Sequence, residues 1–525
     1  MYAGNRRSHG LVRVLLLLAT VLCATSARAG GDDPGSGPVW LVVTRDVFLE
    51  AVKPLAAKRA EDGFNTVVST RPPAEALAGL KRPPAFLLLI GDEQPGRQEQ
   101  PWYIPTNRRK LYRWRTVQKP DFASDALWGD FDGDLAPDIP VGRIPARTPE
   151  QLKLIVDKIL KFEARVPTPE DLCLPIWVGA AGYNPALDSM TTMLLLNIIQ
   201  TNAPSWARPW IISGDPPHPL CGWPEDQPAI FSSRLQQGGF MAVLMGHATA
   251  RSFHSMRFYI RSFDDAVPRP VSIVYSVADV ETRLLGDKPG PPTVILACSA
   301  GSFTEGQSCL AESLLLQPAG PVAAIGATTE SHPLTNYFSG LCLLQQTGRG
   351  HETLGSIWLT AQRAAAVARD FVMEPMLVNV EGKPEEKMNV AALRRDQALM
   401  YALLGDPATR LFLPRELDAT VEHSKGTWRW EARKPKGATR LYVGLRAAGL
   451  TLPTGGARTN KNTARKLFEQ ANDTFAFSRL AEFGADKAWK GVVDKEGTLR
   501  LVATAPGRIY AAAFVLKPPG SAGSR

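Results

Sequence analysis

Two continuous apolar runs, each bounded by Gly or Pro, constrain the fold of this chain more than any other feature. The first covers residues 239–245 and leads through Gly246 to His247, and the second covers residues 292–297 and ends at Cys298. Such runs are typical of strands buried on both faces of a parallel sheet. Ligands bind just beyond the carboxyl ends of these strands. We therefore expect His247 and Cys298 to face each other across one crevice, as a cysteine nucleophile and its base require.

Strand and helix patterns alternate along most of the chain. Residues 149–164 show the apolar spacing of an amphipathic helix, and residues 174–179 form the next apolar strand. This alternation predicts an α/β fold with a mostly parallel sheet flanked by helices. The pattern changes after residues 405–407. Short β-like segments then predict a small C-terminal β-sandwich, at residues 428–432, 439–445, 498–503 and 508–515.

The first residues have the pattern of an export signal. Three Arg residues precede an almost wholly apolar stretch at residues 14–23, and Ala-Arg-Ala at residues 27–29 supplies a small-x-small cleavage pattern. We predict a signal peptide at residues 1–29 and a secreted or periplasmic protein. No later stretch is long and apolar enough to span a bilayer. The other predicted parts are an α/β domain at residues 30–417, a β-sandwich at residues 418–518 and a flexible tail at residues 519–525.

The net charge is mild for a chain of 525 residues. Because the first 29 residues hold four Arg and no acid, the formal charge falls from +9 to +5 after the predicted cleavage. The sequence has no dense basic cluster with interleaved aromatic residues, so we do not expect nucleic acid as a partner.

Five cysteines remain after the predicted cleavage, and an odd count in an exported protein suggests a free thiol. Cys173, Cys221, Cys309 and Cys342 either form two disulfides and leave Cys298 free, or are all buried thiols. A single Cys at a strand end is usually a core residue, so Cys298 alone is weak evidence for function.

The pair of His247 and Cys298 is stronger evidence than either residue alone. Each closes an apolar strand, and each is followed by small residues, at 248–250 and 299–301. Small residues let a substrate backbone approach, and their amide N–H groups can form an oxyanion hole. His254 lies in a predicted loop, where we expect a surface or cleft-wall residue rather than the base.

The segments around His247 and Cys298 resemble the His and Cys motifs of the gingipain family of cysteine peptidases, in the caspase-like clan. The resemblance runs from about residue 39 to residue 413. It implies a caspase-like α/β peptidase domain followed by an immunoglobulin-like β-sandwich, with protein or peptide substrates and no organic cofactor. Four further segments carry it, at residues 86–92, 139–144, 309–312 and 403–407.

The resemblance also implies roles for individual residues. Cys298 is the expected nucleophile and His247 the general base and acid, and the backbone amides of Ala248 and Cys298 are expected to hold the oxyanion. Asp188 aligns with the acid that receives Arg at the cleavage site in Arg-specific members, which implies a preference for Arg or Lys. Alternatively, Asp188 and Ser189 cap the helix that follows them.

Two positions depart from the family pattern. Ala248 stands where the family usually has Gly, and Ala181 aligns with a Glu that orients the His in the best-known members. Either a dyad is sufficient, or another acid such as Glu330 or Asp279 replaces this Glu, or activity is weak. The alternatives to an active endopeptidase are therefore a catalytically impaired caspase-like homologue and a calcium-stabilised extracellular binding protein.

An acidic segment at residues 130–138 predicts a structural Ca²⁺ site. Carboxylates alternate around Gly133, a pattern that suits an oxygen-preferring cation. Val141 stands where an EF-hand loop has its twelfth-position Glu, so the segment is not an EF-hand. The alternative is an acidic turn closed by local hydrogen bonds. The candidate ligands are Asp130, Asp132, Asp134 and Asp138.

Overall fold

The computed structural model describes residues 37–112, 120–180, 182, 185–215, 218–260, 269–381, 388–449, 451–453 and 460–517. The predicted signal peptide at residues 1–29, the predicted tail at residues 519–525 and Ala181 lie outside these ranges. Within them, no helix has both the length and the apolar character needed to cross a membrane.

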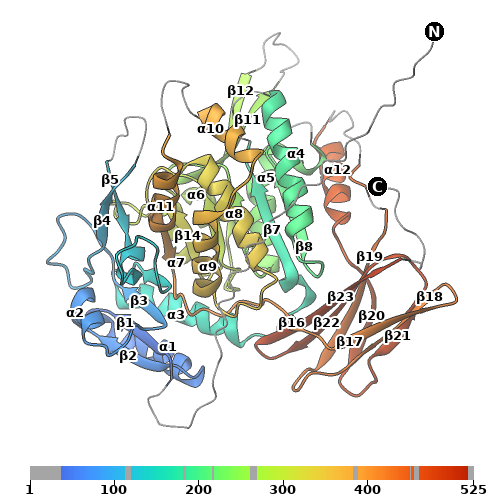
Figure 1. Cartoon of the computed structure of the whole chain (residues 1–525), viewed down its shortest axis with the longest axis horizontal. Helices are drawn as coiled ribbons and strands as arrows, with labels where there is room; N and C mark the ends of the chain where they lie inside the picture. The colour runs from blue at the N-terminus through green and yellow to red at the C-terminus, as the bar shows by residue number, and fades with distance from the viewer. Residues whose placement is uncertain are drawn as a thin grey trace, which may run out of the picture. The chain divides into compact units, whose positions relative to one another are not determined.

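A ten-stranded sheet organises the fold (Figure 1). Its order is β2 (Asn65–Ser69), β1 (Val39–Val43), β3 (Phe86–Ile90), β6 (Val141–Ile144), β15 (Tyr401–Leu404), β14 (Ala324–Ala327), β13 (Thr293–Leu296), β9 (Ala242–Met245), β7 (Cys173–Val178) and β8 (Arg208–Ser213). β14 and β15 pair antiparallel, and the other neighbouring strands pair in parallel. The predicted α/β fold with a mostly parallel sheet is confirmed.

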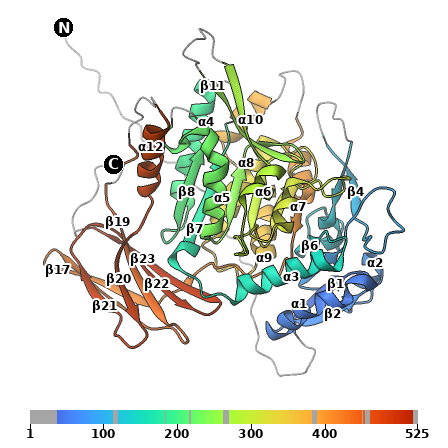
Figure 2. The ribbon, with the colours of Figure 1, turned by 180° about the vertical axis from the view of Figure 1, so that it is seen from behind.

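Helices cover both faces of this sheet (Figures 1 and 2). Successive strand residues point to opposite faces, so Ile295 belongs to one buried cluster, and Val294 and Leu296 belong to another. The Ile295 cluster takes in α1 (Leu49–Glu61), α3 (Pro149–Ala164), α5 (Gln227–Gln237), α6 (Val277–Arg283) and α7 (Leu310–Leu316). The Leu296 cluster takes in α4 (Pro185–Asn202), α8 (Pro333–Gln346), α9 (Leu354–Val367), α10 (Met373–Glu381) and α11 (Val390–Met400).

Smaller elements complete this part of the chain. A three-stranded sheet follows β9 and consists of β10 (His247–Ala248), β11 (Ser252–Ile260) and β12 (Arg269–Ser276). β4 (Asn107–Lys110) and β5 (Asp121–Ser124) form a hairpin, and α2 (Pro73–Ala78) packs in a smaller cluster against β1 and β3. The 3₁₀ turns are η1 (Asp46–Phe48), η2 (Asp125–Gly129), η3 (Pro169–Leu172), η4 (Pro219–Cys221) and η5 (Pro224–Asp226).

The C-terminal part consists of two sheets, as the sequence predicts. Buried residues of both sheets share one core that includes Trp428, Trp430, Leu441 and Leu501. The larger sheet has the order β16 (Arg415–Glu416), β23 (Arg508–Leu516), β22 (Gly497–Ala505), β19 (Arg440–Ala447) and β20 (Ser478–Gly484). The smaller sheet has the order β17 (Ala419–Ser424), β18 (Thr427–Ala432) and β21 (Lys490–Val493). The domain boundary at residues 417 and 418 stays a prediction.

The C-terminal part also contains a helix that the sequence patterns do not predict. α12 (Lys461–Asp473) lies between β19 and β20 in the chain and packs on β8, with the rings of Phe468 and Trp210 5.7 Å apart. The Asn472 amide accepts a hydrogen bond from the Ile211 N–H (2.8 Å) and donates one to the Ile211 carbonyl (3.1 Å). Asn472 therefore satisfies the backbone of a sheet-edge strand that would otherwise be open to another chain.

Two residues of the motifs that carry the family resemblance are buried in ion pairs. Arg143 Nε donates to Asp125 Oδ2 at 2.6 Å, and the Arg143 guanidinium lies 5.0 Å from the centroid of the Phe303 ring. Asp406 Oδ2 accepts from Arg59 Nε at 2.8 Å. These two residues therefore link separate segments of the α/β domain.

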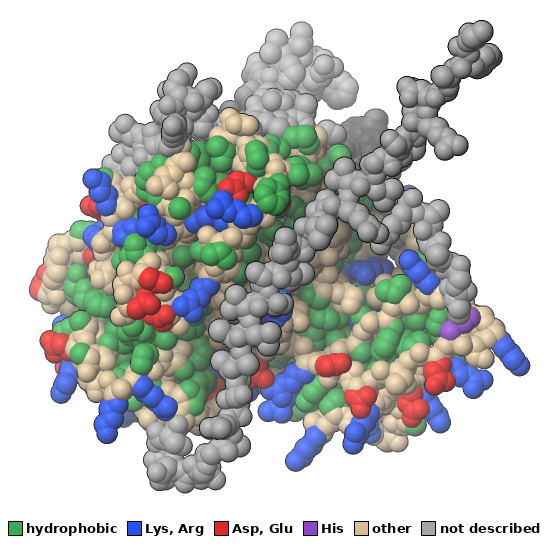
Figure 3. Space-filling view, in the orientation of Figure 1, with side chains coloured by type: hydrophobic (Ala, Val, Ile, Leu, Met, Phe, Trp, Pro, Cys, Tyr) green, Lys and Arg blue, Asp and Glu red, His purple; other side chains and the backbone are tan. Residues whose placement is uncertain are grey.

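Charged side chains are spread over the face of the molecule seen in Figure 3. Lys and Arg side chains are interspersed there with Asp and Glu, and hydrophobic side chains are exposed between them. On this face, the basic excess is not gathered into one continuous surface.

Candidate active site

The structure brings His247 and Cys298 together at one edge of the sheet. β9 and β13 pair in parallel with Met245 opposite Leu296, and each reactive residue follows two positions later. Both residues line a cavity of about 260 Å³. His247 is exposed and Cys298 is half-buried, so a substrate can reach both. The expectation from the two apolar runs is met for these described residues.

The backbone turns sharply directly after Cys298. Ser299 has a φ of +55°, a left-handed conformation that is uncommon for a residue with a side chain. Such conformations cost roughly 1–3 kcal/mol and occur often at active sites. Hydrogen bonds from Ser299 N to Thr329 O (2.8 Å) and from Ser302 N to Ser299 O (3.0 Å) hold this turn. They fix Cys298 at the transition from strand to turn.

A polar chain of side chains leads from Cys298 into the protein. The Ser331 hydroxyl lies 3.8 Å from the Cys298 Sγ, and Sγ lies 3.6 Å from the Ser331 carbonyl. Asn336 Nδ2 donates to Ser331 Oγ at 2.8 Å, and Asn336 Oδ1 accepts from Tyr401 Oη at 2.8 Å and from Gln397 Nε2 at 3.0 Å. Burial raises the pKa of Tyr401, which keeps its phenol protonated as a donor.

The sequence patterns do not single out Ser331. It lies four residues beyond β14, the strand next to β13, so the rule about carboxyl ends of parallel strands could have found it.

His254 lies on the strand that pairs with the short strand of His247. The two histidines are opposite each other in the antiparallel β10–β11 pair. His254 Nε2 lies 3.0 Å from Ser252 Oγ. Burial lowers the pKa of His254, and the neighbouring His247 lowers it further, so His254 stays neutral at neutral pH. The expectation that His254 lies in a loop is wrong, because strand pairing extends from residue 247 across the turn.

The strand geometry accounts for the directions of two backbone amides. The Thr249 N–H donates to Ser252 O at 2.8 Å, and because hydrogen-bonded pairs alternate along an antiparallel ladder, the Ala248 N–H points away from β11. The Leu296 carbonyl accepts a hydrogen bond from the Gly246 N–H at 3.3 Å and therefore points toward β9. Because backbone groups two residues apart in a strand point to the same side, the Cys298 N–H also points toward the His247 segment. Both directions are compatible with the predicted oxyanion hole.

Asp188 lies in the first turn of α4 and is half-buried. The helix runs from Pro185 to Asn202, so Asp188 is inside it, and the expectation that Asp188 and Ser189 cap a helix that follows them is wrong. Pro at the first helical position is the signal that marks this start. The described residues of α4 that line the cavity are Thr191, Thr192 and Leu195, and Asp188 is not among them.

The two acids considered as substitutes for the His-orienting Glu differ in their hydrogen bonds and in their exposure. Asp279 caps α6, where its carboxylate accepts from the Ser276 N–H and hydroxyl at 2.9 and 2.8 Å and from Arg283 Nε at 2.8 Å. Glu330 is exposed.

Three of the four predicted calcium ligands lie together. Carboxylate oxygens of Asp130, Asp132 and Asp138 are all within 4.8 Å of one another, and Asp134 is outside this group. The same carboxylates also accept backbone N–H bonds within the loop, and Asp138 Oδ1 lies 3.1 Å from Arg363 Nη2. The donor set fits a hard cation, and the local turn bonds also fit an acidic turn without one.

The described cysteines are all thiols, and Cys298 alone among them is not fully buried. Burial raises the pKa of Cys173, Cys309 and Cys342, the last to about 11. Reactive cysteines are partly exposed, so the thiol with the accessibility for chemistry is Cys298.

Comparisons with known proteins identify the family and the fold of the chain. The family model of peptidase family C25 matches residues 33–412. The structure of the complex of pro- and mature domains of RgpB from Porphyromonas gingivalis is 14% identical, with 92% of this chain and 100% of that chain covered and a TM-score of 0.50. Another solved structure, described only as a protease, is 16% identical, with 91% and 97% covered and a TM-score of 0.52. At these identities the likeness shows the fold alone. No curated protein sequence matches the chain.

Proposed function

This chain belongs to peptidase family C25, a family of cysteine peptidases, and we propose that it is an endopeptidase in which Cys298 and His247 form the catalytic dyad. One observation carries the proposal: the two residues occupy equivalent positions beyond adjacent parallel strands and line the same cavity. The partial exposure of Cys298 and the strained turn at Ser299 support it.

The reaction follows from this arrangement. His247 takes the proton of the Cys298 thiol, and the thiolate attacks the carbonyl carbon of the scissile bond. The carbonyl oxygen becomes an oxyanion, which the amides of Ala248 and Cys298 hold. His247 returns the proton to the leaving amine, and the C–N bond breaks to leave a thioester on Cys298. His247 then activates a water molecule, which releases the acid and restores the thiol.

We also propose that the protein is exported and becomes secreted or periplasmic. The charged start, the apolar stretch at residues 14–23 and the pattern at residues 27–29 support this. N-terminal sequencing of the protein recovered outside the cytoplasm tests it, and a mature start at Gly30 is the expected result.

A structural Ca²⁺ at Asp130, Asp132 and Asp138 is the third part of the proposal. The grouping of three carboxylates supports it, and a bound ion would join the two ends of this loop. The ion would have no part in the reaction. The preference for Arg or Lys stays a prediction that depends on Asp188.

The dyad is tested with a peptide library whose cleavage products are identified by mass spectrometry, together with the alkylation rate of Cys298 by iodoacetamide. We expect wild-type protein to cleave peptides, Cys298→Ala to cleave none, and His247→Ala to lose cleavage and slow the alkylation of Cys298. Substitution of the buried Cys342 by Ala is the matched control and leaves alkylation at Cys298 unchanged. If His247→Ala does not slow alkylation and no peptide is cleaved, the chain is a catalytically impaired homologue or a binding protein.

A further inference from the structure

The cavity that contains the dyad is mainly apolar. Next to Cys298 and His247, its described wall is formed by strands β9 and β13 and by helices α4, α8 and α10. Apart from the amide of Asn336, which is held by Ser331 and Tyr401, these elements contribute side chains that are hydrophobic or carry only a hydroxyl group. They include Thr192, Leu195, Met245, Leu296, Tyr337 and Leu377.

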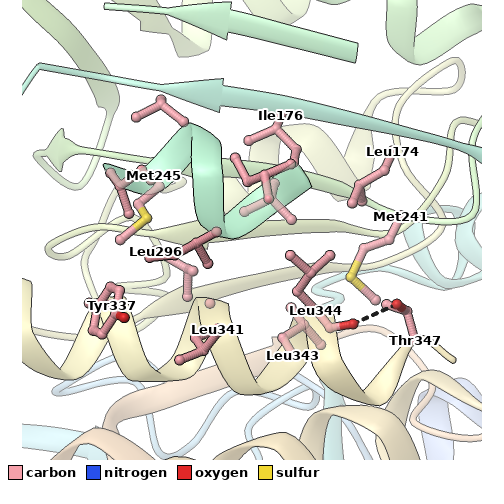
Figure 4. A pocket seen from close by; sticks show the side chains of 16 residues that line it. Leu174, Ile176, Met241, Met245, Leu296, Tyr337, Leu341, Leu343, Leu344 and Thr347 are labelled. Atoms are coloured by element: carbon pink, nitrogen blue, oxygen red, sulfur yellow. Dashed lines mark hydrogen bonds between the residues drawn. The ribbon is translucent and has the colours of Figure 1, made fainter. Parts of the chain in front are cut away.

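The apolar lining continues below this cavity. A second cavity of about 60 Å³ lies between α4, α8 and the sheet, and it shares Leu195, Met245, Leu296 and Tyr337 with the first. Figure 4 shows Met245, Leu296 and Tyr337 at one end of this second cavity, with Leu and Met side chains along its length. The wall that the two cavities share is therefore hydrocarbon, apart from the Tyr337 hydroxyl.

Among the described residues that line this cavity, none has a carboxylate that could pair with a cationic side chain of a substrate. Asp370 contacts a lining residue, because its Oδ2 accepts a hydrogen bond from Tyr337 Oη at 2.6 Å. Its Oδ1 accepts from the Val372 and Met373 N–H groups, both at 2.9 Å, at the start of α10. These three donors already satisfy Asp370. A guanidinium in the cavity would lose water and gain no bidentate partner, which is unfavourable.

Exposed hydrophobic side chains on the same elements agree with an apolar ligand. Met193 on α4 is 65% exposed, and Phe371 and Val372, directly before α10, are 93% and 68% exposed. Contiguous exposed apolar surface is typical of binding sites, and these side chains lie on or directly before elements that line the cavity.

We propose that this cavity receives the side chain of the substrate residue on the acyl side of the scissile bond, and that it selects an uncharged apolar side chain such as Leu, Met or Phe. The inference rests on the proposed dyad, because Cys298 defines where the scissile bond lies. The proposed apolar side chain differs from the Arg or Lys that the family resemblance implies at this position of the substrate.

The test uses peptidyl chloromethyl ketones that differ only in the acyl-side residue, which is Leu, Phe or Arg. The second-order rate of Cys298 labelling is measured for each, and iodoacetamide reports separately whether the thiol is reactive. We expect the Leu or Phe reagent to label at least about tenfold faster than the Arg reagent, since even one missing methylene group in a hydrophobic pocket changes the rate by roughly 10–200-fold.

Two variants make the assignment specific. Thr192→Asp places a carboxylate in the wall and is expected to raise the labelling rate of the Arg reagent relative to that of the Leu reagent. Thr192→Asn, whose side chain has the shape of Asp without its charge, is expected not to raise it. Asp188→Asn is expected to leave the Arg-to-Leu ratio unchanged, because Asp188 is outside the described lining.

Each outcome separates this inference from the proposed dyad. Faster labelling by the Arg reagent, with that advantage lost in Asp188→Asn, overturns the apolar cavity and leaves the peptidase intact. Reaction of Cys298 with iodoacetamide in a His247-dependent manner, but with none of the three ketones, also overturns it. If Cys298 fails to react with iodoacetamide as well, the result contradicts the proposed dyad itself.

Discussion

The Ser331 hydroxyl lies 3.8 Å from the Cys298 sulfur and accepts a hydrogen bond from Asn336 Nδ2 at 2.8 Å. Because Ser331 Oγ accepts the hydrogen bond from the Asn336 amide N–H, its own O–H donates toward the sulfur. Tyr401 and Gln397 fix the amide of Asn336 in turn. A thiolate at Cys298 therefore faces a preorganised donor.

Ser331→Ala is expected to slow alkylation of Cys298 at neutral pH by about tenfold, because a hydrogen bond to a charged group contributes roughly 1.5–3 kcal/mol. The pH profile of alkylation should shift to higher pH. Ser339→Ala is the matched control, since Ser339 belongs to the same buried network through Gln397. An unchanged profile in Ser331→Ala, or an equal shift in both variants, contradicts a role for Ser331 in stabilising the thiolate.

The strands that carry Cys298 and His247 were predictable because buried parallel strands are continuous apolar runs. The rule on carboxyl ends placed both residues at one edge of the sheet, but it predicted neither that β9 and β13 are neighbours nor the β10–β11 pairing that brings His254 opposite His247. A two-residue strand has no pattern of its own in a sequence, because its pairing depends on a turn.

The helix α12 was not predicted, although its local pattern is that of an amphipathic helix. Its buried residues Ala464, Phe468 and Ala471 have helical spacing with polar residues between them, and Asn460 caps its start. What the local pattern does not give is where the helix packs, because the apolar partner of Phe468 is Trp210, which lies in a distant part of the sequence.

Glu312 is expected to make the protein less stable as the pH rises from about 4.5 to 8. Burial, together with the nearby Asp92, raises its pKa from the ordinary value of 4.5 to about 8. In this window the folded chain holds a proton that the unfolded chain has lost, so the free energy of unfolding falls with pH.

Urea unfolding between pH 5 and pH 8 measures this effect of Glu312. The wild type should lose up to about 1.4 kcal/mol per pH unit relative to Glu312→Gln. Glu281→Gln, at an exposed position on α6, is the control and should keep the wild-type slope. Parallel curves for the wild type and Glu312→Gln would show that Glu312 is ionised in the folded state.

Lys158 is expected to have the opposite effect at higher pH. Its ammonium donates to the carbonyls of Leu315 and Gln317 at the end of α7, and burial lowers its pKa from 10.5 to about 7. Between these values the unfolded chain binds a proton that the folded chain does not, so stability rises with pH. Lys158→Met should remove this rise, and Lys161→Met, on the exposed part of α3, should retain it. A rise that persists in Lys158→Met would assign it to another group.

Asp406 is expected to be required for folding stability rather than for chemistry. It accepts from Arg59 Nε (2.8 Å), Trp40 Nε1 (3.1 Å) and the Ala408 N–H (3.0 Å), and its side chain is fully buried. Asp406→Asn keeps the shape but leaves Arg59 without this charge, which should cost about 3–5 kcal/mol by urea unfolding. Trp40→Phe removes one donor and serves as the comparison. A loss below about 1 kcal/mol in Asp406→Asn would show that Glu163 and Asp62 suffice for Arg59.

Calcium is expected to raise the melting temperature through the acidic loop. An ion that binds only the folded state stabilises it by about 2.7 kcal/mol at a free concentration 100 times the Kd. Asp132→Asn removes one of the three grouped carboxylates and should abolish the increase, whereas Asp134→Asn, outside the group, should preserve it. Calorimetry with calcium, with magnesium and with a chelator distinguishes the cases. An equal increase with magnesium, or loss of the increase in both variants, would favour an acidic turn held by its own hydrogen bonds and by Arg363.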